Sequence, residues 1–483
     1  MKKLLAFILL VAVLNSAGAA AAQAEWVSLG TATVDEMFTE RDFDPSYDSF
    51  DEIFLADGAS HSESSAVRID GDTVQIGREG VYKLSGSLSN GQIVVYVQDN
   101  AKVQLVLDGV SVTNQGGAAL HAAKGDKIFV TAAKDSENLL ISTGELHDED
   151  IDAAIYAGTD ICFNGEGKLT VKSESGHGIA TKDDLKICAG TYTIDSAKHG
   201  LSGKDSIRIG GGSINISAGS DGLHSDHNDA DKGYIFICGG ELDIDCAKDG
   251  IDCTNYLSIL GGSVTVKAES DGINAAGEDD FDTSCFVSVS GGVLDITAGE
   301  DGIDSNGSIG VSGGEVYISS SPRGGDGALD YGSQAQISGG TVVAASASQM
   351  AANFSAADIQ GSMLCAFTRT HSAGDKITLS SDGVELLSFM PELDYQAVVI
   401  SSPDVKAGGS YTVSAGDETV EIVMSESLFS NGFGPMGGFG MMPPEGMPGE
   451  EFPGKGFGKF PFGRGERDKG APPSGELPMP PME

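Results

Sequence analysis

The sequence has few positive charges: 29 lysines and arginines stand against 71 aspartates and glutamates, for a formal net charge of −42. A polyanion of this size repels nucleic acids and other anionic surfaces unless cations intervene. Nucleic acid is therefore excluded as a partner. An acidic ligand would need either a bridging cation or a local strip of basic side chains.

Long apolar runs are absent beyond the first residues. Lys2 and Lys3 precede a short apolar run, and Ala22-Gln23-Ala24 has the pattern of a cleavage site. Residues 1–24 are therefore predicted to be a secretory signal peptide, which implies a secreted or extracellular protein. This run is too short to span a bilayer and no later segment could, so no membrane span is expected.

Tryptophan is nearly absent, because Trp26 is the single one and it lies outside the repeat described below. A flat aromatic surface for crystalline glucan would have to use Tyr and Phe. The cysteine count is odd, at seven, and the cysteine positions follow the repeat. We interpret most of them as small buried side chains and not as a disulfide framework.

What the sequence does contain is a repeat with a usual period of 22 residues. A phrase of His or Asp, then Gly, then an apolar residue occurs at His177-Gly178-Ile179, His199-Gly200-Leu201, Asp221-Gly222-Leu223, Asp249-Gly250-Ile251, Asp271-Gly272-Ile273, Asp301-Gly302-Ile303 and, more loosely, Asp326-Gly327-Ala328. A second glycine returns in step, at Gly190, Gly212, Gly240, Gly262, Gly292, Gly314 and Gly340. A fixed period of this length indicates a solenoid, in which no repeat can bury its apolar face alone.

Apolar residues recur two positions apart on both sides of this second glycine. Ile207 and Ile209 precede Gly212, and Ile214 and Ile216 follow it. Spacing of two predicts strands, and no cluster has helical spacing. Three short strands per repeat, turned by Gly and Asp, predict an all-β fold: a parallel β-helix with about 22 residues per coil and coils about 4.8 Å apart.

The remaining segments flank this solenoid. Residues 25–66 are acidic and weakly patterned, and are expected to form a linker or an N-terminal cap. The β-helix is predicted over residues 67–361, followed by a small C-terminal β cap over 362–429 in which the period is lost. Residues 430–483 are rich in Gly, Pro, Phe and Met and are predicted to be a disordered tail.

Stacking of the coils places acidic side chains in columns. The first column contains Asp221, Asp249, Asp271 and Asp301; the second contains Asp252, Asn274 and Asp304. Turn chemistry explains the first column, because Asp tolerates tight turns before Gly, but a turn requires no acid in the second. Stacked like charges repel, and Ca²⁺ relieves this because it binds six to eight oxygens. We therefore expect calcium at these columns, with Asp148, Asp150 and Asp152 in an acidic insertion as further candidate ligands.

Two further columns are candidates for contacting a polymer. Lys182, Lys204 and Lys232 each stand eight residues before the second glycine of their repeat, and Tyr234, Tyr256 and Phe286 each stand six residues before it. The lysines could balance the acidic columns or could meet uronate carboxylates. The aromatic residues could pack beneath the insertions or could stack on sugar rings.

Several phrases resemble a known family. They are Gly91-Gln92-Ile93-Val94-Val95, Val103-Gln104-Leu105-Val106-Leu107-Asp108-Gly109-Val110, Thr181-Lys182-Asp183-Asp184-Leu185, Gly203-Lys204-Asp205-Ser206-Ile207, Lys232-Gly233-Tyr234-Ile235 and Val398-Val399-Ile400-Ser401-Ser402-Pro403-Asp404. With the Gly/Met/Pro-rich tail, they are similar to the secreted clostridial carbohydrate-binding β-helix family, from about Val67 to the end of the chain. The resemblance implies a pectate-lyase-like, right-handed β-helix that holds calcium and binds cellulose or polygalacturonate without cleaving it. His177 and His199 depart from it, since they stand where an acid would continue the first column.

We therefore expect a non-catalytic, extracellular binder of polygalacturonate or cellulose that is assisted by calcium, with a polysaccharide as its partner. The tail could attach the protein to cell-surface polymers. One alternative is a calcium-dependent pectate-type lyase with Lys182, Lys204 or Lys232 as the base. Another is a structural surface adhesin whose rod spaces the tail from the cell.

Overall fold

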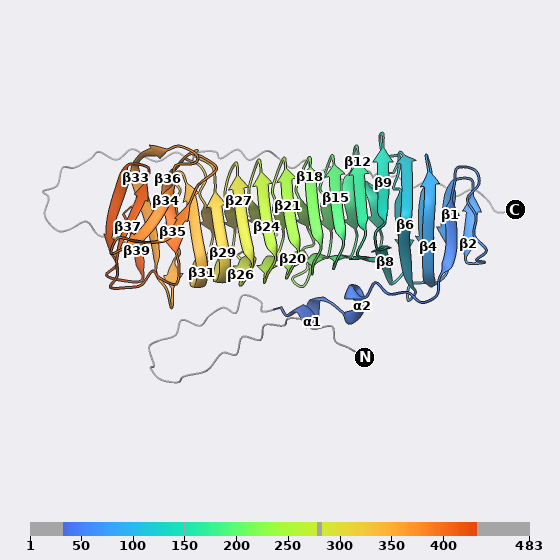
Figure 1. The fold of residues 1–483 in the computed structure, drawn as a ribbon, viewed down its shortest axis with the longest axis horizontal. Helices are drawn as coiled ribbons and strands as arrows, with labels where there is room; N and C mark the ends of the chain where they lie inside the picture. Colours follow the sequence, from blue (N-terminus) through green and yellow to red (C-terminus); the bar gives the residue numbers. More distant parts are fainter. Residues whose placement is uncertain (1–31, 149, 278–282, 432–483) are drawn as a thin grey trace, which may run out of the picture. The chain divides into compact units, whose positions relative to one another are not determined.

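The computed structural model describes residues 32–148, 150–277 and 283–431. These residues form a parallel β-helix of stacked coils, closed by a β cap at its C-terminal end (Figure 1). This confirms the predicted fold class. The predicted signal peptide, nearly all of the predicted tail, and the acids Glu278, Asp279, Asp280 and Asp282 lie outside the described residues. No helix in the described part of the chain is long and apolar enough to cross a membrane.

Each coil contributes strands to three faces. The twelve-stranded face consists of β2 (Val67–Asp70), β3 (Thr73–Ile76), β5 (Gln92–Tyr96), β7 (Leu120–Lys124), β10 (Ala153–Ala157), β13 (His177–Thr181), β16 (Leu201–Gly203), β19 (Leu223–Ser225), β22 (Ile251–Cys253), β25 (Ile273–Ala275), β28 (Ile303–Ser305) and β30 (Leu329–Tyr331). The pre-glycine face consists of β8 (Lys127–Ala132), β11 (Asp160–Gly165), β14 (Asp184–Ile187), β17 (Ser206–Ile209), β20 (Tyr234–Ile237), β23 (Tyr256–Ile259) and β26 (Phe286–Val289). The post-glycine face consists of β9 (Glu137–Thr143), β12 (Lys168–Ser173), β15 (Thr191–Ser196), β18 (Ser213–Ala218), β21 (Glu241–Cys246), β24 (Ser263–Ala268) and β27 (Val293–Ala298).

Long strands continue these faces at both ends of the solenoid. They are β1 (Asp51–Leu55), β4 (Gly80–Leu88) and β6 (Lys102–Gln115) at the N-terminal end, and β29 (Ser308–Ser319) and β31 (Gln334–Ser346) at the C-terminal end. Parallel pairing therefore begins at β1, within the segment that the sequence suggested was a linker or cap. At this end β2 and β3 form an antiparallel hairpin.

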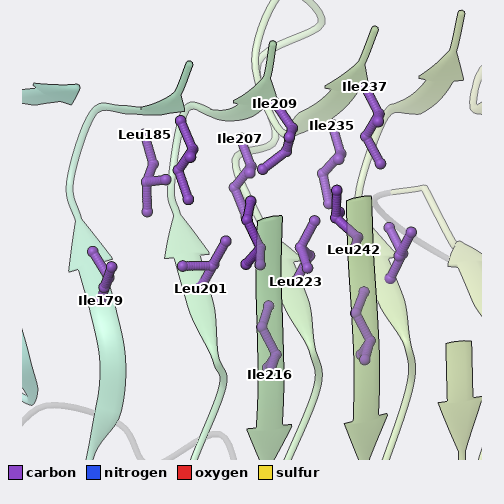
Figure 2. Packing of buried hydrophobic residues seen from close by; sticks show 14 of the residues in the cluster. Ile179, Leu185, Leu201, Ile207, Ile209, Ile216, Leu223, Ile235, Ile237 and Leu242 are labelled. Atoms are coloured by element: carbon purple, nitrogen blue, oxygen red, sulfur yellow. The ribbon is translucent and has the colours of Figure 1, made fainter. Parts of the chain in front are cut away.

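The inward aliphatic side chains form one continuous core (Figure 2). Ile214 pairs in register with Leu242, and Ile216 with Ile244, and all four are at most 1% exposed. Complete burial of one such side chain stabilises a fold by about 1.5–3 kcal/mol, and every coil repeats the gain. The predicted inward columns are therefore correct.

The two glycines of the repeat are required for different reasons. Gly262 has a φ of 93°, so it provides the left-handed turn between β23 and β24. Gly272 is needed for space, because an added Cβ would lie 2.3 Å from a methyl group of Ile296 and 2.6 Å from the carbonyl oxygen of Gly302. The His/Asp-Gly phrase is thus a place where each coil approaches the next too closely for a side chain.

A short N-terminal segment, which we call the strap, crosses several coils along the outside of the pre-glycine face. It consists of residues 33–44 and contains α1 (Val34–Met37) and α2 (Glu40–Phe43) (Figure 1). Met37 and Phe38 pack against Phe236 and other residues of that face. Sequence analysis did not identify this packing.

A buried ion pair fastens the strap to the coils. The carboxylate of Asp42 is fully buried and lies 3.1 Å from the Lys127 ammonium and 3.3 Å from the Lys186 ammonium. Burial works to raise the pKa of Asp42, but the backbone N–H of Thr39 and the two ammonium groups lower it to about 2. Arg208 adds a hydrogen bond of 3.0 Å to the carbonyl oxygen of Met37.

At the C-terminal end, β36 (Tyr395–Ser401) pairs antiparallel with β31 and covers the last coil. It continues into β33 (Ser362–His371) and β39 (Leu428–Ser430), and β32 (Ala356–Ala357) pairs with β31. A separate sheet contains β34 (Ile377–Ser381), β35 (Val384–Phe389), β37 (Ser410–Ala415) and β38 (Glu418–Val423). The open edge of the β-helix is therefore occupied.

Asp42→Ala should release the strap, because it leaves the buried Lys186 ammonium without an ion-pair partner among the described residues and leaves Lys127 with only Asp160, at 3.8 Å. The expected cost to strap docking is about 3 kcal/mol, measured by hydrogen exchange of the strap amides and by urea denaturation. Asp44→Ala is the control, since the Asp44 side chain is 53% exposed. Strap amides protected equally in both variants would contradict the role of Asp42.

The docking should also weaken in acid. Folding lowers the pKa of Asp42 from 3.8 to about 2, so its contribution is fully present above about pH 4 and is lost as the pH falls toward 2. Exchange protection of the strap measured across this range in the parent and in Asp42→Asn should converge at the acid end.

Candidate functional site

The first column forms a ladder of hydrogen bonds along one corner of the solenoid. The Asp249 carboxylate accepts the backbone N–H of Asp271 at 3.1 Å, and the Asp271 carboxylate accepts that of Asp301 at 2.8 Å. The Asp221 carboxylate does the same for Asp249 at 3.3 Å, and that of Asp301 accepts from Gly327 at 2.6 Å. Each carboxylate therefore accepts a backbone hydrogen bond from the turn of the next coil, as expected if these acids are turn residues.

The loose seventh phrase is out of register by one residue. Leu329 pairs with Ile303, so Gly327 and not Asp326 falls opposite Asp301. The same pairing places Asp330 opposite Asp304 and extends the second column by one acid. The sequence interpretation of Asp326-Gly327-Ala328 as an equivalent phrase was wrong, because the preceding loop shifts the strand.

The second column runs beside the first on the outside of the twelve-stranded face. Asp252 pairs with Asn274, and Asn274 with Asp304, as expected. Burial and the nearby carboxylates Asp249 and Asp301 raise the pKa of Asp271 to about 8. Burial together with Asp330 and Asp304 raises that of Asp301 to about 7. Within the described residues, no Lys or Arg forms an ion pair with Asp249, Asp271 or Asp301.

The acidic insertion contributes less to this surface. Asp148 and Asp150 are exposed, and the Asp148 carboxylate accepts the backbone N–H of Asp150 at 3.0 Å. Asp152 lies 3.0 Å from His177 Nε2 and 3.3 Å from the Lys198 ammonium. These three acids therefore lie near the histidine end of the first column and not beside Asp271 or Asp301.

Acidic partners surround the predicted lysine column. Lys204 lies 3.3 Å from Asp226, and Lys232 lies 2.8 Å from Asp205. A hydrogen bond with Tyr156 raises the pKa of Lys182, and one with Asp205 raises that of Lys232. In this arrangement the lysines balance acidic charge.

The aromatic column stacks as predicted but is partly covered. Tyr234 and Tyr256 have ring centroids 4.6 Å apart, and Tyr256 and Phe286 have centroids 5.0 Å apart, with nearly parallel planes. Tyr234 is 5% exposed because Met37 of the strap covers it and the guanidinium of Arg208 lies over its ring. Tyr234 therefore cannot offer its ring to a sugar, which corrects that part of the expected strip.

Tyr256 and Phe286 are half-buried and line a small pocket. Its volume is about 270 Å³, and its other lining residues are Ala32, Ala230, Asn255 and Ser284. Of the predicted aromatic strip, this pocket is the part that a ligand could reach.

A larger groove lies at the N-terminal coils, where sequence analysis did not place a site. It has a volume of about 740 Å³ and includes the exposed rings of Phe50 and Phe54. The Lys83 ammonium lies 5.5 Å from the centre of the Phe50 ring and 2.8 Å from the Asp108 carboxylate. The polar lining residues are Asp51, Glu52, His61, Ser62, Glu63, Ser64, Lys83, Ser85 and Asp108.

The signal for this groove was present in the residues of β1. The run Phe50-Asp51-Glu52-Ile53-Phe54-Leu55 includes β1 and the phenylalanine before it. Within this run Ile53 and Leu55 point into the core. Phe54 points outward, but this segment lies outside the regular period, and its composition predicted only an acidic linker or an N-terminal cap.

A model of a family named carbohydrate-binding domain-containing protein matches residues 70–327 and 243–423. A protein of Acetivibrio thermocellus with the same name is 31% identical over 147 residues, which are 29% of this chain and 51% of that protein. The match thus spans about half the length of this relative. A solved structure of a polysaccharide lyase-like protein from C. thermocellum, a gadolinium derivative, has 29% identity and a TM-score of 0.47, covering 50% of this chain and 97% of its own. Because the two family-model matches together span residues 70–423, well over half of the sequence, the chain belongs to the family of carbohydrate-binding domain-containing proteins.

Proposed function

We propose that this protein is a secreted, non-catalytic binder of polysaccharide and that a sugar chain docks in the groove at its N-terminal coils. The observation that carries the proposal is the pair of exposed phenylalanine rings, Phe50 and Phe54, in an open groove lined by hydroxyl and carboxylate groups. Sugar rings present apolar faces and polar edges, so they match this combination. Family membership supports the same function.

The lysine strip is the second candidate surface for an acidic polymer. Its lysines already have carboxylate neighbours, so a polygalacturonate chain would have to displace Asp205 or Asp226 to pair with Lys232 or Lys204. The groove requires no such exchange. We therefore assign β-linked glucan to the groove and leave the strip as the site to be compared in the same experiment.

The lysines also bear on the alternative of a lyase. A lysine that acts as a base at neutral pH needs a lowered pKa. The hydrogen bond with Tyr156 raises the pKa of Lys182, and that with Asp205 raises the pKa of Lys232. This favours binding over cleavage. An incubation with polygalacturonate and calcium that produced an ultraviolet-absorbing unsaturated product would contradict it.

Calcium fits the acidic columns by the chemistry of the donor set. Asp249, Asp271 and Asp301, with Asp252, Asn274, Asp304 and Asp330 beside them, supply only oxygen ligands apart from one amide nitrogen. The raised pKa values of Asp271 and Asp301 mean that each ionised carboxylate lacks a stabilising positive charge. A bound calcium ion would supply that charge, and it could accept carboxylates of a polyuronate as further ligands.

Calcium should reverse a loss of stability that appears as the pH rises. Folding raises the pKa of Asp271 from 3.8 to about 8, so the metal-free protein should lose stability as the pH rises from about 4 to about 8, because folding must take up a proton that the unfolded chain has already lost. Calcium replaces that proton, so its effect on the melting temperature should be largest at the alkaline end.

A matched pair of variants tests this assignment. Asp271→Asn removes the charge and keeps an oxygen for the N–H of Asp301, so the metal-free protein should melt higher at pH 8 and respond less to calcium. Asp243→Asn removes an exposed acid elsewhere and should behave like the parent. If chelator and calcium leave the melting curves of all three proteins alike, the columns are turns alone.

Binding to the groove should depend on its two rings. Phe50→Ala with Phe54→Ala should weaken retention on insoluble cellulose about ten- to hundredfold, since two stacking contacts of about 0.7–1.4 kcal/mol each are lost. Sedimentation with cellulose measures this. Tyr96→Ala removes a ring that is 54% exposed outside the groove and serves as the control.

The triple variant Lys182→Ala, Lys204→Ala and Lys232→Ala tests whether the lysine strip binds polysaccharide. It should retain cellulose binding, and any loss should appear with polygalacturonate. If the triple variant loses cellulose while the double phenylalanine variant keeps it, the sugar docks on the strip. A parent protein that sediments with neither polymer would favour the structural adhesin.

A further inference from the structure

Four side chains converge where the first column changes from histidine to aspartate. His199 Nδ1 lies 2.9 Å from Asp221 Oδ2, and His224 Nδ1 lies 3.2 Å from the same oxygen. The second carboxylate is that of Asp252, whose Oδ2 lies 2.8 Å from His224 Nδ1. One ligand atom each from His199, Asp221 and His224 lie within 4.8 Å of one another.

Hydrogen bonds within the protein do not fully account for these contacts. His199 Nδ1 lies 3.2 Å from the backbone nitrogen of Asp221. In the later coils a carboxylate oxygen occupies the equivalent position and accepts the corresponding N–H. A nitrogen that accepts this N–H carries no proton, so it cannot donate a hydrogen bond to the Asp221 carboxylate oxygen that lies 2.9 Å away. A cation that binds the oxygen, and that takes the nitrogen lone pair in place of the backbone N–H, would remove the repulsion between these two atoms.

We propose that His199, Asp221, His224 and Asp252 bind one divalent transition-metal ion, of which zinc is the test case. Zinc bonds to histidine nitrogen at about 2.0–2.1 Å and to carboxylate oxygen at about 2.0–2.2 Å, which places neighbouring ligand atoms about 3.0–3.4 Å apart. Three of the separations between ligand atoms, 2.8, 2.9 and 3.2 Å, are already close to these values. Because the planes of the His199 and His224 rings are parallel, one ring must turn for both nitrogens to point at the same ion. Two neutral imidazoles and two carboxylates also match the charge of a divalent ion.

The surroundings hold the ligands in place and leave a route for the ion. The His199 and His224 rings stack with centroids 4.1 Å apart and planes 2° apart, and His177 stacks on His199 at 4.7 Å. The Asp221 side chain is 2% exposed, whereas the other three are 17–21% exposed. The site is therefore mostly dry, with one side open to solvent.

This site differs in kind from the carboxylate columns further along the solenoid. Imidazole nitrogen is a ligand for zinc, copper and nickel, whereas calcium takes oxygen. The stretch from Asp271 to Asp304 offers no histidine in either column. The sequence therefore changes ligand type along the column, from a mixed nitrogen–oxygen site to oxygen sites. This inference does not depend on carbohydrate binding.

A proton is the competing occupant. Burial opposes the charged form of His224, but hydrogen bonds with Asp221, Asp226 and Asp252 raise its pKa to about 11. An imidazolium at His224 would hold the two carboxylates together in place of a metal. The experiment must therefore distinguish a bound ion from a buried proton.

The mature chain, prepared without a histidine tag and with excess calcium to occupy oxygen sites, is dialysed against zinc and its metal content measured. We expect one tightly held zinc ion per chain and a higher melting temperature. His224→Asn should bind this ion at least about tenfold more weakly. His227→Asn, three residues away and outside the ligand set, should bind like the parent. Cobalt should give the parent a visible absorption spectrum that His224→Asn lacks.

His224→Asn should fold, because Asn274 occupies the same column two coils further on. Its melting temperature in chelator, compared with that of the parent in chelator, checks this. If the parent binds no zinc, or if His224→Asn and His227→Asn bind it equally, the metal site is wrong. A parent without zinc in which the His224 ring stays protonated well above neutral pH by NMR would assign the position to a proton.

Discussion

The structure depends on one constraint: every side chain of a coil lies one strand spacing, about 4.8 Å, from its equivalent in the next coil. Each column must therefore tolerate contact with copies of itself. Aliphatic side chains such as Ile216 and Ile244 gain from it, and aromatic rings such as Tyr234 and Tyr256 stack because of it. Carboxylates repel under the same spacing, so an acidic column needs backbone N–H groups, histidines or cations.

The acidic corner contains different solutions to this repulsion. At one end, His199 and His224 face Asp221; although burial raises the pKa of that carboxyl, the two imidazole rings hold it well below its usual range. Further along, Asp271 and Asp301 have no such partners among the described residues and their pKa values rise. The same backbone geometry thus produces two electrostatic environments, and the residues at two positions of the repeat, one in each column, decide between them.

The repeat allowed the fold to be predicted, because a period of 22 residues with spacing of two inside each cluster admits few structures. Features outside the period could not be inferred in this way. The strap depends on Asp42 meeting Lys127 across 85 positions of sequence, and no periodicity marks such a contact. Tyr234 was correctly placed in a stack, but its burial depends on Met37 of the strap. The groove was missed for the same reason, since Phe54 belongs to a strand before the regular coils.

Both ends of the solenoid are closed by structures that differ from the coils between them: the hairpin of β2 and β3 at one end and the antiparallel strand β36 at the other. Apart from the strap, which contacts several coils, each coil in between is joined only to its neighbours. Gain or loss of one whole 22-residue unit would leave both closures intact. The length of the acidic corner can thus evolve in steps of one coil, while the structures that close the two ends stay the same.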